Sequence, residues 1–313
     1  MERALSEPEA HAIWVPDAYA ARMAQVEANG IRIEYETAGS GDPLLLVMGL
    51  GGQLTDWPPE LVDLLADEGF QVITFDNRDI GLSTAFDWDP PTQTRALLGN
   101  MVRRPPEAGY EIADMAADAA GLLTALGVGP AHIVGISMGG MIAQQLAIDH
   151  PSVVRSMTSI MSHTGDRKRG LPSKRLLAKF ARMPVPTRET AVEASVRSFS
   201  LFCGPHFEPE VHRERAKISV ERSFRPDGVA RQTAAIMASP DRTIALAGVT
   251  APTLVVHGLV DPLVRPSGGI ATAVAVPDSR LVMYPDMGHD LPRPRWGELV
   301  GEIRANAARA PSV

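Results

Sequence analysis

A serine flanked by two glycines stands where an apolar run gives way to a helical pattern. Residues 131–136 are mostly apolar, and Gly135-Ile136-Ser137-Met138-Gly139 leads into helix-spaced apolar side chains over 141–147. The G-x-S-x-G pattern between a strand and a helix is typical of a nucleophile elbow, whose sharp turn holds the serine on a strained backbone. The glycines remove side chains that would collide in so tight a turn. The alternative is a plain strand-to-helix turn, but the flanking elements favour a nucleophilic role for Ser137.

Ser137 would need a general base and an acid that orients this base. His289 follows the apolar run 280–284, and Asp261 follows the apolar run 252–256. In parallel α/β sheets, active sites lie at the carboxyl ends of the strands. Because these ends meet at one edge of the sheet, both side chains would lie at the same edge as Ser137. The chain order Ser, Asp, His also fits this arrangement. We therefore predict that Ser137, Asp261 and His289 are the catalytic residues.

Other acidic and imidazole groups leave alternatives for the acid and the base. Asp166 follows the preceding strand pattern and competes for the acid role, but it lies beside a run of basic residues. His257 stands within an apolar run, which favours a packed side chain over a catalytic base. Asp286 and Asp290 flank His289 and are poorly placed to reach its ring from the same loop.

A glycine-rich stretch, Met48-Gly49-Leu50-Gly51-Gly52-Gln53, follows the apolar run 44–47. It lacks the Lys-Ser/Thr of a P-loop and the spacing of a dinucleotide fingerprint, so a phosphate-binding role is disfavoured. Glycines instead let the backbone approach a reacting carbonyl, where N–H groups can hold an oxyanion. We predict that the N–H groups of Leu50 and Met138, the latter at a helix N-terminus, form this oxyanion hole.

Strand-like and helix-like patterns alternate along most of the chain, which predicts an α/β fold with a mostly parallel central sheet flanked by helices. The alternation stops over 163–245, where Arg- and Glu-rich helical patterns broken by prolines indicate an inserted helical cap. We therefore predict a core formed by 31–162 and 246–313, preceded by an amphipathic N-terminal arm over 1–30. The long Pro-rich stretch 86–106 is typical of a lid or a binding loop.

Composition narrows the functional classes. The 313 residues carry a formal net charge of −7 at pH 7, which does not indicate a nucleic-acid partner. The single cysteine, Cys203, cannot form an internal disulfide and favours a reducing compartment. The charged start of the chain has no signal-peptide core and no apolar run is long enough for a membrane span, so we expect a cytoplasmic protein. No metal-ligand pattern is visible, and we expect neither a metal nor a cofactor.

Taken together, these motifs resemble the α/β-hydrolase superfamily over about residues 31–313. Within it, the chain is similar to the bacterial esterase branch that includes the actinobacterial lipase/esterase-like proteins and the aclacinomycin methylesterase. The nearer resemblance rests on Leu-Leu-Val-Met-Gly, Asp-Asn-Arg-Asp-Ile-Gly-Leu-Ser, Gly-Ile-Ser-Met-Gly-Gly-Met-Ile-Ala-Gln and Gly-His-Asp-Leu-Pro. Two positions depart from the broader family, because Met48 stands where a histidine is usual and Asp79 stands where a glycine is common.

The resemblance implies a carboxylic-ester hydrolase in which His289 deprotonates Ser137 and an acyl-enzyme forms. A cap at the carboxyl edge would roof the site, so we expect Trp57, Phe199 and Phe202 to shape a pocket for a small to medium ester. Haloalkane dehalogenases and many epoxide hydrolases share the fold but use an aspartate at the elbow, and Ser137 argues against them. A lactonase, an acyltransferase, a C–C hydrolase or a perhydrolase on the same triad, or a non-catalytic small-molecule receptor, remains an alternative.

Overall fold

One sheet runs through the computed structural model, which describes residues 23–90 and 107–311. Its strands are β1 (Met23–Ala28), β2 (Ile31–Ala38), β3 (Asp42–Val47), β4 (Phe70–Phe75), β5 (Ala131–Ile136), β6 (Val154–Ile160), β7 (Thr253–Gly258) and β8 (Ser279–Tyr284). They lie side by side in the order β1-β2-β4-β3-β5-β6-β7-β8. The crossovers between neighbours bring together residues that are far apart in the sequence.

Most of this sheet is parallel. β1 pairs antiparallel with β2, and β2 pairs antiparallel with β4, whereas every pair from β4 to β8 is parallel. The central strands β5 and β7 are buried along almost their whole length, as their continuous apolar runs predict. Because they are parallel, β3, β5, β7 and β8 all end at one edge. The predicted fold class, a mostly parallel sheet flanked by helices, is confirmed.

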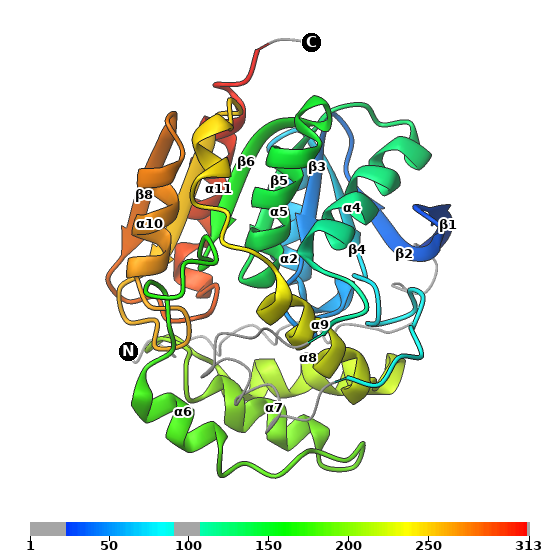
Figure 1. The fold of residues 1–313 in the computed structure, drawn as a ribbon, viewed down its shortest axis with the longest axis vertical. Helices are drawn as coiled ribbons and strands as arrows, with labels where there is room; N and C mark the ends of the chain where they lie inside the picture. Colours follow the sequence, from blue (N-terminus) through cyan, green and yellow to red (C-terminus); the bar gives the residue numbers. More distant parts are fainter. Residues whose placement is uncertain (1–22, 91–106, 312–313) are drawn as a thin grey trace, which may run out of the picture.

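Helices cover both faces of the sheet (Figure 1). One hydrophobic cluster packs the sheet against α4 (Ile112–Leu126) and α5 (Met138–Asp149). A second cluster packs the opposite face against α2 (Pro59–Asp67) and α11 (Trp296–Ala307). A further helix, α10 (Ser267–Ala275), contacts β7 and β8. The strand ends that carry the predicted site residues therefore project from a core that is packed on both sides.

Between β6 and β7 the chain leaves the sheet and forms a group of helices. These helices are α6 (Lys174–Phe180), α7 (Ala191–Phe199), α8 (Pro209–Arg222) and α9 (Pro226–Ala238). Figure 1 shows them together below the sheet, at the edge where the parallel strands end. Helices α8 and α9 each begin with a proline, whose missing N–H costs nothing at that position. We call this group the cap, and its predicted limits at 163 and 245 stay a prediction.

The start of the described chain differs from the predicted N-terminal arm. Residues 23–28 form β1, which makes a hairpin with β2 and pairs Ala28 with Ile31. The turn between them is Asn29-Gly30, and both residues have positive φ angles, of 49° and 75°. Residues 1–22 of the arm, and most of the predicted binding loop over 86–106, lie outside the described residues. Within the described ranges, no helix is long and apolar enough to cross a membrane.

Candidate active site

Ser137 occupies the tight turn between β5 and α5. Its φ is 57° and its N–H donates to the Ile160 carbonyl oxygen at 2.8 Å. A Cβ atom added at Gly135 would lie 2.0 Å from the Gly139 carbonyl oxygen, and one added at Gly139 would lie 2.0 Å from the Val47 carbonyl oxygen. The backbone segments of β3, β5 and α5 thus touch here. This confirms the steric reason for the two glycines that the sequence suggested.

Three side chains from three strand ends form a hydrogen-bonded row. Ser137 Oγ lies 2.9 Å from His289 Nε2, and His289 Nδ1 lies 2.7 Å from Asp261 Oδ2. Asp261 and His289 are buried, and Ser137 is half-buried. In the tautomer that satisfies both contacts, Nδ1–H donates to the carboxylate and Nε2 accepts from the serine hydroxyl. The structure therefore brings together the three residues that the sequence predicts as catalytic.

The Asp261 carboxylate is held by its own loop. Its Oδ1 atom accepts hydrogen bonds from the Leu263 and Val264 N–H groups, at 2.8 and 2.9 Å. The other oxygen, Oδ2, is left for the imidazole of His289. The loop that follows β7 therefore aims one carboxylate oxygen at the imidazole ring.

His257 and Asp166 were the alternatives for the base and the acid. His257 is fully buried and its Nε2–H donates to the Val264 carbonyl oxygen at 2.7 Å. Burial lowers the pKa of His257, so its ring is neutral near pH 7 and packs as the sequence indicates. Asp166 accepts from the Lys168 N–H at 2.8 Å and lies 3.6 Å from Arg169, within its own loop. The carboxylate that meets His289 is that of Asp261.

The glycine-rich loop after β3 lies against the elbow. A Cβ atom added at Gly49 would lie 3.2 Å from Ser137 Cβ, so the two backbones approach closely. Asn77 supports the loop, because its Nδ2 atom donates to the Met48 carbonyl oxygen at 3.1 Å. Met138 is the first residue of α5, where N–H groups have no partner in the preceding turn. The Leu50 and Met138 N–H groups thus belong to segments that adjoin Ser137.

Comparison with known proteins decides the family. Residues 42–292 match the model of the family described as alpha/beta hydrolase fold.

The chain belongs to the α/β-hydrolase family.

Similar proteins in the family include esterase-type enzymes. The chain is 29% identical over 297 residues to rhodomycin D methylesterase of Streptomyces sp. (strain C5), covering 87% of this chain and 94% of that protein. Among solved structures, the enol-lactonase of Burkholderia xenovorans LB400 matches with a TM-score of 0.69 at 21% identity, over 91% of this chain and all of that one. A meta-cleavage product hydrolase matches with a TM-score of 0.70 at 19% identity, over 93% of this chain and all of that one. These structures share the fold, and the relatives together are consistent with hydrolase activity.

The cap of this α/β-hydrolase reaches the glycine-rich loop through a residue that the sequence analysis missed. Gln232, on α9, is fully buried and its Oε1 atom accepts from the Gly51 N–H at 2.9 Å. Its Nε2 atom donates to the Arg78 carbonyl oxygen at 2.9 Å. Gln232 therefore fixes the peptide that follows Leu50. No local sequence pattern predicts this contact, because it joins residues that are 181 positions apart in the chain.

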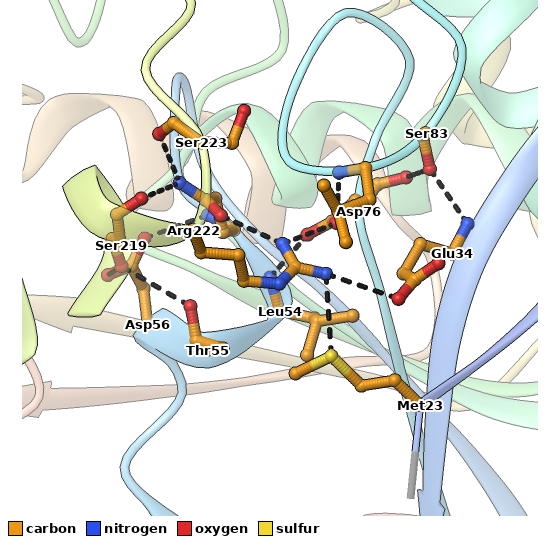
Figure 2. A network of polar contacts seen from close by, with 12 residues as sticks. Met23, Glu34, Leu54, Thr55, Asp56, Asp76, Ser83, Ser219, Arg222 and Ser223 are labelled. Atoms are coloured by element: carbon orange, nitrogen blue, oxygen red, sulfur yellow. Dashed lines mark hydrogen bonds and ion pairs between the residues drawn. The ribbon is translucent and has the colours of Figure 1, made fainter. Parts of the chain in front are cut away.

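A network of buried charges also joins the cap to the core, as Figure 2 shows. Arg222, at the end of α8, contacts Asp76 at 2.7 Å and Glu34 at 3.6 Å. Burial raises the pKa of Asp76, whereas the Arg222 charge opposes this shift. Asp76 also accepts from the Leu54 N–H at 2.8 Å, and Ser219 of α8 donates to Asp56 at 2.7 Å. The loop that begins at Asp76 thus anchors the cap to the core.

The predicted substrate-binding aromatics have different surroundings. The Phe202 ring meets the His289 ring edge-on with centroids 5.8 Å apart, and Phe199 lies 4.8 Å from Phe202. Trp57 was expected to shape the pocket, but only 1% of its surface is exposed. It packs in the hydrophobic cluster shared with α2 and α11, so its indole belongs to the core. Although Trp57 is close in sequence to the glycine-rich loop, its side chain packs among apolar core residues instead of lining the site.

The described residues also bear on the other expected components of the site. Within 23–90 and 107–311, no group of three His, Cys, Asp or Glu side chains is arranged to hold a metal ion. Burial raises the pKa of the Cys203 thiol, which keeps it protonated and poorly nucleophilic at neutral pH. Ser137, by contrast, has an imidazole within hydrogen-bonding reach that in turn contacts a carboxylate.

Proposed function

We propose that this α/β-hydrolase is a serine carboxylic-ester hydrolase that acts on small to medium esters through Ser137, His289 and Asp261. The observation that carries the proposal is the continuous row from Ser137 Oγ to His289 Nε2 at 2.9 Å and from His289 Nδ1 to Asp261 Oδ2 at 2.7 Å. A hydroxyl bonded to a neutral imidazole that a buried carboxylate orients is the arrangement that nucleophilic acyl transfer needs.

The reaction follows from this arrangement in two stages. His289 takes the Ser137 proton as the oxygen attacks the ester carbonyl, and then gives that proton to the leaving alcohol. The acyl-enzyme is hydrolysed when water, deprotonated by His289, attacks the same carbonyl; the bond to Ser137 Oγ then breaks, His289 returns the proton to Ser137, and the acid is released. In both stages the N–H groups of Leu50 and Met138 would hold the oxyanion, and Asp261 would stabilise the imidazolium.

Two further observations support an ester as the substrate. The similar protein from Streptomyces is named as a methylesterase, and the match spans 94% of its length. The Phe202 ring beside His289 offers an apolar wall on the cap side, and Phe199 extends this wall. Apolar walls with few polar groups suit the acyl part of a small ester. The cap position also suits a site that takes small molecules rather than long lipids or polymers.

The proposal is tested by labelling and mutation of the serine. A fluorophosphonate should label wild-type protein at Ser137, and Ser137→Ala should lose at least about 10³-fold in kcat on p-nitrophenyl butyrate. Ser195→Ala is the matched control, because Ser195 Oγ lies 2.9 Å from His212 Nε2 in the cap without belonging to the row. Near-normal turnover by Ser137→Ala would overturn the mechanism, as would loss of labelling in Ser195→Ala alone.

The acyl length that fits the site is tested with p-nitrophenyl esters from acetate to palmitate. Each buried methylene contributes about 0.8 kcal/mol, so kcat/KM should rise about fourfold per added methylene until the pocket is full. We expect the maximum at roughly C4–C8, without activation at a lipid interface. A maximum at acetate would indicate a shallower pocket, and a rise out to palmitate would contradict the small-ester proposal.

A further inference from the structure

The loop that carries His289 touches the cap at the level of the backbone. Residues 286–290, here called the base loop, meet cap residues 202–204. A Cβ atom added at Gly204 would lie 2.5 Å from the Asp286 carbonyl oxygen, and one added at Gly288 would lie 2.4 Å from the Gly204 nitrogen. The His289 N–H itself donates to the Phe202 carbonyl oxygen at 2.8 Å. The main chain of the proposed base is therefore bonded directly to the cap.

Asp290 joins the two segments a second time. Its Oδ1 atom accepts from the Gly204 N–H and from the Gly288 N–H, both at 3.0 Å. One carboxylate oxygen thus bridges a cap amide and a base-loop amide on either side of the glycine contact. The His289 ring is not the partner of this oxygen, because its two nitrogens face Ser137 and Asp261. Asp290 acts on the backbone that carries the imidazole.

The position of that backbone matters for the rate. A general base must lie within hydrogen-bonding reach of the proton that it takes, and a misplacement of about 1 Å can cost on the order of 100-fold in rate. Gly288, directly before His289, gives the chain more conformational freedom than any other residue would. Without a fixed partner for the Gly288 N–H, the imidazole would sample positions beyond the 2.9 Å contact with Ser137.

We propose that Asp290 is a positioning residue, whose bridge between cap residues 202–204 and the base loop holds His289 in line with Ser137. This inference rests on the proposed function, because it gives Asp290 its effect through the base. The cap, on this account, is part of the apparatus that places the catalytic groups. Its removal or detachment would misplace the base even if the substrate could still bind.

The test compares two substitutions of Asp290 on p-nitrophenyl butyrate. Asp290→Ala removes the accepting oxygen, and kcat should fall about 10- to 100-fold while KM stays within about threefold. Asp290→Asn keeps an oxygen of the same shape that can accept both N–H groups, and it should recover most of kcat, to within about threefold of wild type. Equal damage in the two variants, or wild-type kcat in Asp290→Ala, would overturn the inference.

Asp286→Ala is the matched control in the same loop. Asp286 bonds the side chains of Arg295 and of His206 in the cap, whereas Asp290 bonds the main-chain N–H groups of Gly204 and Gly288, so loss of Asp286 should leave kcat within about twofold. If Asp290→Ala does not fold, Asp290→Ser replaces it, since its shorter hydroxyl cannot span both amides and the same fall in kcat is expected. Wild-type kcat in a folded Asp290→Ser enzyme would overturn the inference equally.

A double-mutant cycle separates positioning from general damage. With His289→Ala as background, adding Asp290→Ala should change the residual rate by less than about twofold, because the group that it positions is gone. A further fall of tenfold or more would overturn the assignment. Ser137→Ala distinguishes the two proposals, because an active Ser137→Ala enzyme refutes the proposed function, whereas an inactive one beside fully active Asp290→Ala refutes the positioning role alone.

Discussion

The elbow after β5 and the base loop after β8 are built in different ways. The elbow is fixed by the core, through the Ser137 N–H bond to the Ile160 carbonyl oxygen and the contact of Gly139 with Val47. The base loop is fixed by the core on one side, where the Val260 N–H donates to the Met287 carbonyl oxygen, and by the cap on the other. Ser137, the proposed nucleophile, is thus placed by the sheet and its helices, whereas His289, the proposed base, is placed by these elements together with the cap.

This difference separates two kinds of sensitivity. Substitutions at the elbow should lower the free energy of unfolding, because main-chain segments of the sheet and of α5 are in close contact there. Substitutions where the cap meets the loops should lower kcat more than the free energy of unfolding, because they alter the alignment of catalytic groups without disrupting the core. The Asp261 loop belongs with the elbow in this respect, since its carboxylate is held by N–H groups of its own chain segment.

The largest effect on turnover outside Ser137 and His289 is expected at Asp261. Asp261→Asn should lower kcat by about 10²–10⁴-fold, because an amide can favour the wrong tautomer of the imidazole. Asp166→Asn should change kcat by less than about twofold, because its contacts lie within its own loop. Steady-state assays on one ester compare the two. The opposite ranking would move the acid to the loop after β6 and break the comparison.

A large effect on stability is expected at the elbow. Gly139→Ala puts a Cβ atom 2.0 Å from the Val47 carbonyl oxygen, and we expect it to lower the free energy of unfolding by at least about 3 kcal/mol. Gly301→Ala, on the exposed side of α11 with nothing within 4 Å, should raise it by about 0.5–1 kcal/mol. Urea unfolding measures both. An unaffected Gly139→Ala protein would contradict the tight contact.

A smaller effect on turnover is expected where the cap meets the glycine-rich loop. Gln232→Met keeps the side-chain length but leaves the Gly51 N–H without its acceptor, so kcat should fall about tenfold. Gln145→Met is the control, since Gln145 lies on α5 and bonds Asp149 four residues on. Its kcat should stay within about twofold. A fall in both variants alike, with matching losses in thermal stability, would argue against a specific role of Gln232.

We expect that removing metal ions has no effect on turnover. Both regions work with hydroxyl, imidazole, carboxylate and N–H groups, and the proposed mechanism has no step that a metal supplies. Overnight dialysis against EDTA should therefore leave kcat and KM unchanged on p-nitrophenyl butyrate. A loss of activity that one divalent cation restores would place a metal in the reaction and contradict the proposal.

The groups at the strand ends could be predicted because each is encoded locally. The apolar runs before Ser137, Asp261 and His289 define where strands end, and parallel strands end at one edge. The hairpin of β1 also had a local signal, since Asn29-Gly30 suits a tight turn with two positive φ angles. It was missed because 23–28 is a partly exposed edge strand without a long apolar run.

The cap contacts had no such signal. Gln232 meets Gly51, and Asp290 meets Gly204, through bonds between residues 181 and 86 positions apart. Nothing in the local composition of α9 or of the base loop distinguishes these polar side chains from others on a solvated face. The prediction for Trp57 was wrong for a related reason. Its position in the sequence shows that it lies near the glycine-rich loop, but not whether its side chain points toward the site or into the core.

Cys203 lies in the contact between the cap and the base loop, since a Cβ atom on Gly288 would sit 2.5 Å from its carbonyl carbon. Alkylating reagents attack the thiolate, and burial raises the pKa of this thiol, so the closed contact should react slowly with iodoacetamide. It is also the chain's single cysteine. Its alkylation rate should therefore rise in variants that loosen the contact between the cap and the base loop, such as Asp290→Ala, as local unfolding raises the reactivity of groups within a contact.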